Sequence, residues 1–183
     1  MLKKIVNYLL VKKYPEILLK GERIIIRNFI LSDFSKLEGS FQDKELIKYA
    51  FGLEKMDMDL KEMFKKYKKQ ILNGSGNYYS ILYKDEFSGI ISSYYPDRKN
   101  KKLIKLGLMI TEEKSRNIGI GTESLNLIID HLEKTKGLHE IQMDTAIFNE
   151  RAVRCFRKCG FDITGEFVDR NGVKKHLLSR KFL

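Results

Sequence analysis

The spacing of apolar side chains along the chain predicts an alternation of strands and amphipathic helices. Apolar residues recur at helical spacing over residues 59–72 and again from the glycine-rich turn near residue 120 to Lys136, and a glycine follows each stretch. Runs that are continuously apolar, or that alternate between apolar and polar residues, predict seven strands: 23–29, 78–83, 87–95, 103–110, 141–145, 161–168 and 174–182. Residues 103–110 are almost continuously apolar, which is typical of a central strand covered on both faces.

Two shorter helices complete the predicted order of elements. Residues 33–49 have a loosely helical pattern, and residues 149–158 read as a short helix with Asn149 as its N-cap and Gly160 just past its end. The resulting order is strand, helices, two strands, strand, helix, strand, helix and two strands, with no internal repeat and no linker. This order predicts one mixed α/β domain.

The first residues of the chain have a pattern of their own. Residues 2–10 place Leu and Ile side chains on one helical face, with lysines nearby, so we expect residues 1–20 to form an N-terminal helical extension of a domain that spans residues 21–183. Such a helix would either lie on a membrane surface or pack on the domain or on the partner subunit of a homodimer.

Composition narrows the class of protein and its location. The chain has 183 residues, 43% hydrophobic and 32% charged, which fits one globular domain. No apolar run is long enough to span a membrane, and no cleavage-site pattern follows the first lysines, so we expect a cytoplasmic protein. The two cysteines, Cys155 and Cys159, are too few for a disulfide framework or a four-ligand zinc site. The net charge of +11 suggests an anionic partner.

The glycine-rich turn is the segment that carries chemistry. Gly119 and Gly121 open a helix whose first N–H groups lack intrahelical partners, and Arg116 adds a positive charge, so the turn favours binding of a phosphate or pyrophosphate. It is not a P-loop, because no Lys-Ser or Lys-Thr follows the glycines. It is not a dinucleotide fingerprint either, because Ser124 stands where the third glycine would be.

Three stretches carry motifs that are specific in combination. They are Arg-x-x-Gly-x-Gly at 116–121, the block NERAVRCFRKCGF at 149–161, and the opening stretch GERIIIRNFILSDF at 21–34. Together they resemble the GNAT acyltransferase superfamily, and within it the subgroup of ribosomal-protein alanine and spermidine N-acetyltransferases. The resemblance covers residues 21–183. The family often has Gly where this chain has Asn117, and because Asn tolerates a positive φ, we expect the turn to survive.

The resemblance implies a single mixed, mostly antiparallel sheet flanked by helices, with central strands that splay apart. Acetyl-CoA, the cosubstrate, would lie in the wedge between residues 103–110 and 141–147. The first strand would pair with the pantetheine arm, the turn would wrap the pyrophosphate, and the short helix would flank the thiol and the nucleotide. The cofactor-binding residues implied in this way are Leu108, Met109, Ile110, Arg116, Asn117, Ile118, Gly119, Ile120, Gly121, Thr122, Asn149, Phe156 and Lys158.

The implied reaction is the attack of a primary amine on the thioester, and here the chain departs from its relatives. Many relatives carry a Tyr where this chain has Phe156, and all nine tyrosines lie at or before Tyr95. Relatives often carry a Glu where Lys105 stands. Backbone N–H groups of residues 108–110 would stabilise the oxyanion, and water could supply the proton. Asp144 and Cys155 are the remaining candidates for catalytic side chains.

The acceptor amine is the least defined part of the prediction. Six carboxylates gather in a region that lines the acceptor side in the resembling families: Asp43, Glu45, Glu54, Asp57, Asp59 and Glu62. Such a cluster would suit a polyamine or an aminoglycoside, unless the carboxylates only cap helices and pair with lysines. A protein N-terminus is the other acceptor. We therefore expect a small-molecule or peptide amine as the partner.

Two rival classes stay open. One is a basic nucleic-acid-binding module, which would use the positive charge but for which the chain has no zinc finger and no RNA-binding signature. The other is a CoA-binding domain that has lost catalysis, because of Phe156 and Lys105.

Overall fold

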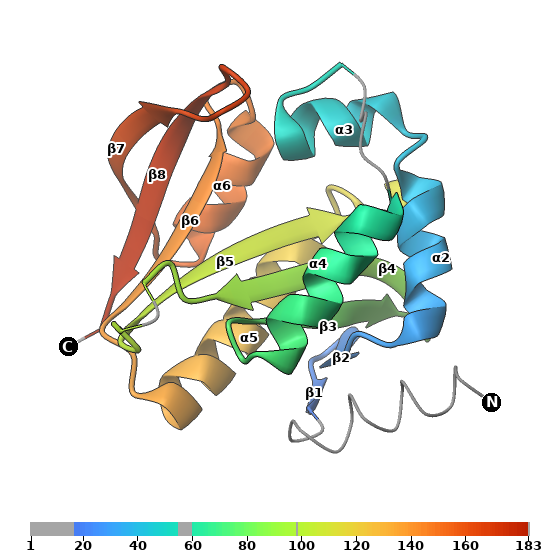
Figure 1. The fold of residues 1–183 in the computed structure, drawn as a ribbon, viewed down its shortest axis with the longest axis horizontal. Helices are drawn as coiled ribbons and strands as arrows, with labels where there is room; N and C mark the ends of the chain where they lie inside the picture. Colours follow the sequence, from blue (N-terminus) through green and yellow to red (C-terminus); the bar gives the residue numbers. More distant parts are fainter. Residues whose placement is uncertain (1–16, 55–59, 98, 183) are drawn as a thin grey trace.

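One eight-stranded sheet, with helices on both of its faces, forms the framework of the chain (Figure 1). The computed structural model describes residues 17–54, 60–97 and 99–182. The strands lie in the order β1-β2-β3-β4-β5-β6-β8-β7. Their bounds are Leu18–Lys20 for β1, Ile24–Asn28 for β2, Gly76–Tyr83 for β3, Glu86–Tyr94 for β4, Leu103–Ile110 for β5, Glu140–Ala146 for β6, Asp162–Val168 for β7 and Lys174–Lys181 for β8.

The helices lie between strands where the apolar periodicity placed them. They are α2 (Leu31–Ser40), α3 (Lys44–Phe51), α4 (Leu60–Leu72), α5 (Ile120–Lys136) and α6 (Glu150–Lys158), with a 3-10 turn η1 at Glu113–Ser115. The stretch predicted as one loose helix over residues 33–49 is two helices, because the Asp43 carboxylate accepts a hydrogen bond from Leu46 N–H and starts a new helix there. In the described ranges, no helix is long and apolar enough to cross a membrane.

The two central strands splay, as the resemblance implied. Strands β5 and β6 are parallel and pair only where Leu103–Lys105 lies beside Glu140–Gln142, while all the other strand pairs are antiparallel. Beyond Lys105, β5 keeps β4 as its neighbour and β6 keeps β8, and the two strands diverge (Figure 1). The predicted mixed, mostly antiparallel sheet with splayed central strands is therefore confirmed.

Apolar side chains on the two faces of the sheet form two cores. The larger one lies under α5 and α6 and includes Ile26, Ile91, Ile128 and Phe161, all but inaccessible to solvent. The smaller one lies under α2 and α4 and contains Leu37, Met63, Phe87 and Ile90. A sheet that is buried on both faces explains why residues 103–110 are apolar at almost every position.

The predicted N-terminal extension is partly corrected. Residues 1–16, which carry the helical pattern, lie outside the described residues. Its last residues, Leu18–Lys20, are not helical: they form strand β1, which pairs antiparallel with β2 from Lys20↔Ile25 to Leu18↔Arg27. Backbone hydrogen bonding to an existing strand decides the conformation of these residues, and the pattern of their own side chains does not show it. The division of the chain into an extension and a domain stays a prediction.

Candidate functional site

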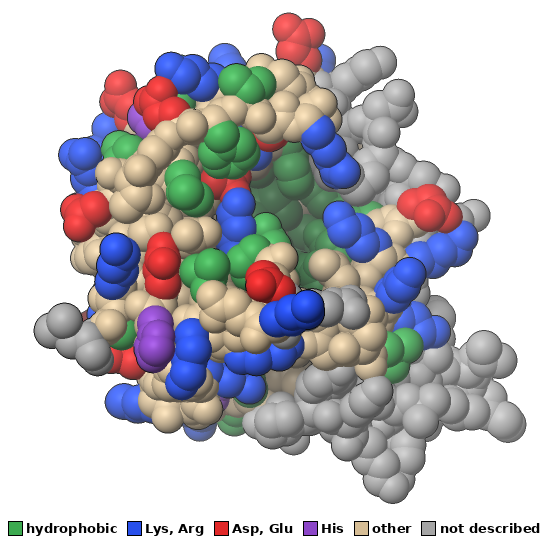
Figure 2. Space-filling model, turned by 60° about the vertical axis from the view of Figure 1, so that its left-hand side comes forward, with side chains coloured by type: hydrophobic (Ala, Val, Ile, Leu, Met, Phe, Trp, Pro, Cys, Tyr) green, Lys and Arg blue, Asp and Glu red, His purple; other side chains and the backbone are tan. Residues whose placement is uncertain are grey.

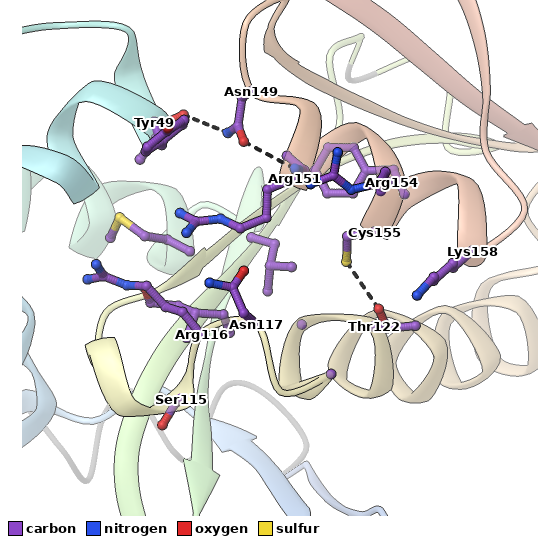
Figure 3. A pocket seen from close by; sticks show the side chains of 18 of the residues that line it. Tyr49, Ser115, Arg116, Asn117, Thr122, Asn149, Arg151, Arg154, Cys155 and Lys158 are labelled. Atoms are coloured by element: carbon purple, nitrogen blue, oxygen red, sulfur yellow. Dashed lines mark hydrogen bonds between the residues drawn. The ribbon is translucent and has the colours of Figure 1, made fainter.

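A cavity of about 310 Å³ lies where β5 and β6 have separated. The C-terminal half of β5, the turn over residues 115–119, the first turn of α5, one face of α6 and the end of α3 enclose it (Figure 3). From the side of β7 and β8 the molecule is visibly hollowed, with hydrophobic side chains inside the hollow and Lys and Arg side chains around its rim (Figure 2).

The structure brings most of the predicted cofactor-binding residues to this cavity. The residues that line it are Leu108, Met109, Ile110, Arg116, Asn117, Gly119, Gly121, Thr122, Asn149, Phe156 and Lys158. Ile118 and Ile120 are not among them. Ile118 is exposed and its carbonyl accepts a hydrogen bond from Arg23, whereas Ile120 points into the larger core. Sequence neighbours in a turn point in different directions, so these two residues could contribute only through their backbone.

The backbone of the turn has the conformation that the motif requires. Asn117 has φ of 61° and Gly119 has φ of 89°, so the expectation that Asn117 would adopt a positive φ is confirmed. The first helical hydrogen bond runs from Glu123 N–H to Gly119 C=O. The N–H groups of Ile120, Gly121 and Thr122 therefore precede the hydrogen-bonded ladder of α5 and have no partner within it.

Gly121 lets the first turn of α5 pack closely against its neighbours. A Cβ added at Gly121 would lie 3.3 Å from Cδ2 of Leu108 and 3.5 Å from Sγ of Cys155. The open N–H groups therefore lie directly beside β5 and α6, at the positive end of a 17-residue helix. This end of the cavity can bind an anion such as a phosphate.

Arg116 does not present its charge to the cavity in the way that the sequence predicted. Its side chain is only 6% exposed, and Nη2 donates to Oδ2 of Asp43 at 2.6 Å and to the Thr111 carbonyl at 2.7 Å. Its Nε donates to the Ile110 carbonyl at 3.1 Å. The guanidinium thus joins the turn to β5 and α3. Burial alone would raise the pKa of Asp43, but the Leu46 N–H and the Arg116 guanidinium hold it below its usual value.

The exposed cations at the cavity come from α6. Arg154 and Lys158 both line it, are exposed, and lie one helical turn apart on the same face. Arg154 pairs with Glu150 at 3.1 Å across the solvent-exposed surface, where an ion pair contributes little. Among the described residues that line the cavity, the exposed positive charge therefore comes from α6 rather than from Arg116.

Asn149 makes the predicted cap and a second, long-range contact that its motif did not indicate. Its Oδ1 accepts from Ala152 N–H at 3.1 Å, which confirms the predicted N-cap of α6. Its Nδ2 donates to the Tyr49 carbonyl at 2.9 Å and so ties α3 to α6 across the cavity (Figure 3). Through this contact α3 supplies three lining residues that the sequence reasoning missed, namely Leu46, Tyr49 and Ala50. They are about 100 positions from α6, and no local signal marks them.

Cys155 lies in the last turn of α6 and Cys159 is its C-cap, and the two cysteines have different environments. Cys155 lines the cavity with Sγ 3.4 Å from Oγ1 of Thr122, and Cys159 is buried. A hydrogen bond with Cys159 lowers the pKa of Cys155 to about 7, helped by Thr122 and by the charge of Lys158. The same hydrogen bond and burial raise the pKa of Cys159. Cys155 is therefore the more acidic thiol of the pair.

Asp144, the other candidate catalytic side chain, is held in ion pairs and does not line the cavity. Its carboxylate lies 2.5 Å from Nζ of Lys105 and 3.3 Å from Nζ of Lys175. Burial alone would lower the pKa of Lys105, but Asp144 and Tyr94 raise it. Asp144 is therefore engaged by two ammonium groups outside the cavity and is not positioned to contact a substrate amine there.

The carboxylates considered for binding a polycation are mostly paired. Asp43 pairs with Arg116, Glu45 lies 3.5 Å from Arg151, and Glu62 pairs with Lys65 at 2.7 Å. Glu54 is exposed, and Asp57 and Asp59 lie outside the described residues. In the part of the chain that the structure describes, no group of three acidic, His or Cys side chains could hold a metal ion.

Comparison with known proteins gives one family and a set of similar structures. The model of the acetyltransferase (GNAT) domain family matches residues 23–162. RimL, a ribosomal-protein alpha-N-acetyltransferase solved with coenzyme A, superposes with a TM-score of 0.77 and 17% identity, over 91% of this chain and 98% of its own. Spermidine N-acetyltransferase from Vibrio cholerae, solved with CoA and spermine, gives 0.74 and 15%, over 88% and 96%. Aminoglycoside acetyltransferase AAC(6')-Ib with coenzyme A gives 0.72 and 18%, over 86% and 94%.

Proposed function

Because the chain belongs to the GNAT acetyltransferase family, we propose that it transfers an acetyl group from acetyl-CoA to a primary amine. The observation that carries the proposal is the first turn of α5, whose open N–H groups face a cavity that also exposes an edge of β5. This arrangement fits the two chemically distinct parts of the cosubstrate, a polyanionic end and a pantetheine arm with amide groups. Similar folds have been solved with CoA or acetyl-CoA bound.

Each part of the cavity has a chemical task in this proposal. The N–H groups of Ile120, Gly121 and Thr122 would bind phosphate oxygens, with Arg154 and Lys158 adding positive charge. Beyond Lys105, the edge of β5 turned away from β4 faces the cavity, so its backbone groups can pair with the amides of the pantetheine arm. An N–H of the same edge, within residues 108–110, would stabilise the negative charge that develops on the thioester oxygen.

The described residues that line the cavity include no Asp, Glu or His. The chain therefore offers no carboxylate or imidazole there as a general base, and we propose that the amine reacts in its neutral form after losing a proton to water. The rate should then rise with pH as more of the amine is deprotonated.

The acceptor belongs to one of three classes of primary amine: a protein N-terminus, a polyamine or an aminoglycoside-like molecule. Three of the four described carboxylates of the predicted acceptor side, Asp43, Glu45 and Glu62, are paired, which weakens the case for recognition of a polycation by free negative charge. A cytoplasmic location and a homodimer remain predictions from the sequence.

The test combines an activity assay with a binding assay. Release of free thiol from acetyl-CoA is measured over a panel of N-terminal peptides, polyamines and aminoglycosides, and CoA binding is measured by calorimetry. Gly119→Trp should abolish binding, since Gly119 has a positive φ and an added Cβ would lie 3.0 Å from Nη2 of Arg23, beside the open N–H groups. Gly172→Trp is the matched control, because Gly172 also has a positive φ but an added Cβ there meets nothing within 4 Å.

Three outcomes separate the alternatives. Thiol release with one amine class, together with binding lost only in Gly119→Trp, supports the proposal. CoA binding without thiol release over the whole panel indicates the rival with lost catalysis, in line with Phe156 and with the ion pair of Lys105 and Asp144. No CoA binding by the wild-type chain, with a salt-sensitive gel shift of nucleic acid, would replace the proposal with the nucleic-acid-binding class.

A further inference from the structure

The departing sulfur of the cosubstrate needs a proton, and this inference rests on the proposed function. When the C–S bond breaks, its electron pair stays on sulfur, and a nearby acid can neutralise that charge. Phe156 lines the cavity but has no hydroxyl and cannot donate a proton; its ring is buried and lies 6.3 Å from the ring of Phe161. The question is which other side chain of the cavity could act as the acid.

The cavity has two ends that differ in chemistry (Figure 3). At one end, Thr122 and Cys155 lie at the N-terminus of α5, with the charge of Lys158 nearby. At the other end, Asn149 binds the Tyr49 carbonyl, and the guanidinium of Arg151 lies 4.9 Å from the centre of the Tyr49 ring. If the phosphates occupy the α5 end, the thioester lies toward the end that carries Tyr49.

Among the described residues that line the cavity, four side chains carry a hydroxyl or a thiol: Tyr49, Ser115, Thr122 and Cys155. Ser115 is 1% exposed, and its hydroxyl bonds to that of Ser88 at 3.2 Å. Thr122 and Cys155 contact each other at the anion-binding end. Tyr49 is therefore the remaining acid at the end where the thioester would lie.

The residues around Tyr49 contact its backbone carbonyl and its ring, and none of these contacts uses the hydroxyl. Its backbone carbonyl is held by Asn149, one face of the ring is covered by Arg151, and the ring of Phe148 lies 6.3 Å away. Each of these contacts uses the backbone or the ring.

We propose that Tyr49 is the general acid of this enzyme and replaces the hydroxyl that Phe156 lacks. The amine nitrogen bonds to the acetyl carbon, the C–S bond breaks, and the Tyr49 hydroxyl gives its proton to sulfur. The products are the N-acetyl amine and the free thiol. The proton that the amine loses passes to water, and the phenolate of Tyr49 regains a proton from water, so the enzyme returns to its starting state.

The test variant is Tyr49→Phe, which removes one oxygen and keeps the ring, the stacking of Arg151 and the bond from Asn149 to the main chain. We expect kcat to fall by roughly 100-fold, the low end for loss of a general acid, because a thiolate is already a moderate leaving group. The dissociation constant of CoA should stay within twofold of wild type. The loss should appear in kcat and leave KM for the amine and for acetyl-CoA within twofold of wild type.

Tyr83→Phe is the matched control, since it makes the same change at a half-buried tyrosine on β3 outside the cavity, and it should keep the wild-type kcat. A Tyr49→Phe variant with a kcat within twofold of wild type, or with a loss confined to KM, would overturn the assignment. The wild-type assay separates this failure from that of the proposed function: if wild type releases no thiol with any amine, the proposed function fails, whereas an active wild type with an equally active Tyr49→Phe removes only Tyr49.

Discussion

Replacing Arg116 with Met should destabilise the fold more than it weakens direct contacts with the cosubstrate. The substitution removes three hydrogen bonds from a charged donor, to Asp43, Ile110 and Thr111, and leaves the Asp43 carboxylate without its cation. Hydrogen bonds to charged groups contribute about 1.5–3 kcal/mol each, and breaking a buried ion pair costs about 3–5 kcal/mol. Because Asp43 is 32% exposed, water recovers part of this loss. We therefore expect about 3 kcal/mol.

Urea denaturation with an unchanged m-value measures this loss, and calorimetry with CoA measures binding under conditions where the variant is folded. Arg154→Met is the matched control, since its side chain is 67% exposed and its partner Glu150 is 80% exposed. That change should alter the free energy of unfolding by less than about 0.5 kcal/mol and should weaken CoA binding.

A structural role for Arg116 is contradicted if Arg116→Met behaves as expected for Arg154→Met, and the reverse. An Arg116→Met protein as stable as wild type, but at least tenfold weaker in CoA binding, would show that the guanidinium serves the phosphates directly. The structure would then have assigned it to the wrong partner.

Two further predictions follow from groups with shifted pKa values. Burial alone would raise the pKa of Asp33, but hydrogen bonds from Arg27 and Ser80 lower it, so its contribution to stability is complete above the unfolded value of 3.8 and is lost as pH falls. Asp33→Asn should therefore lower the free energy of unfolding by about 3 kcal/mol at pH 7 and by less near pH 3; a gap that does not depend on pH would contradict this. Iodoacetamide should alkylate Cys155 with a midpoint near pH 7, and CoA should protect this thiol. Peptide mass spectrometry that found Cys159 modified first would contradict the assignment of Cys155 as the more acidic thiol.

Local features of the functional site were predictable from the sequence because they depend on residues close together in the chain. Asn149 caps α6, Asn117 and Gly119 take positive φ, and the α5 N–H groups open toward the cavity, as the motifs indicated. Capping and backbone conformation are set within about four residues, so a single motif contains the information that they need.

The mixed α/β composition of the domain could be predicted for a related reason, whereas the mixed, mostly antiparallel sheet was implied by the family resemblance. Apolar periodicity identified the strands and helices, and the near-continuous apolar run of Leu103–Ile110 marked the strand that is covered on both faces. The pattern did not identify β1, because a three-residue edge strand is defined by its partner β2 and not by its own side chains.

Contacts between distant residues decided what individual side chains do. The sequence predicted that Arg116 would contribute its charge to a phosphate site. In the structure its guanidinium pairs with Asp43, 73 positions away. The sequence also left Asp144 as a candidate catalytic group, but in the structure its carboxylate forms ion pairs with Lys105 and Lys175.

The sequence by itself indicated the family, most of the order of the elements and the backbone conformation of the glycine-rich turn, because each of these depends on short-range patterns. It also placed every tyrosine at or before Tyr95, ahead of the glycine-rich turn and α6. Only the tertiary structure brought Tyr49 to the cavity, through the bond between Asn149 and α3 that spans 100 positions. Such contacts depend on which residues the fold brings close together in space, and this proximity cannot be read from their separation along the chain.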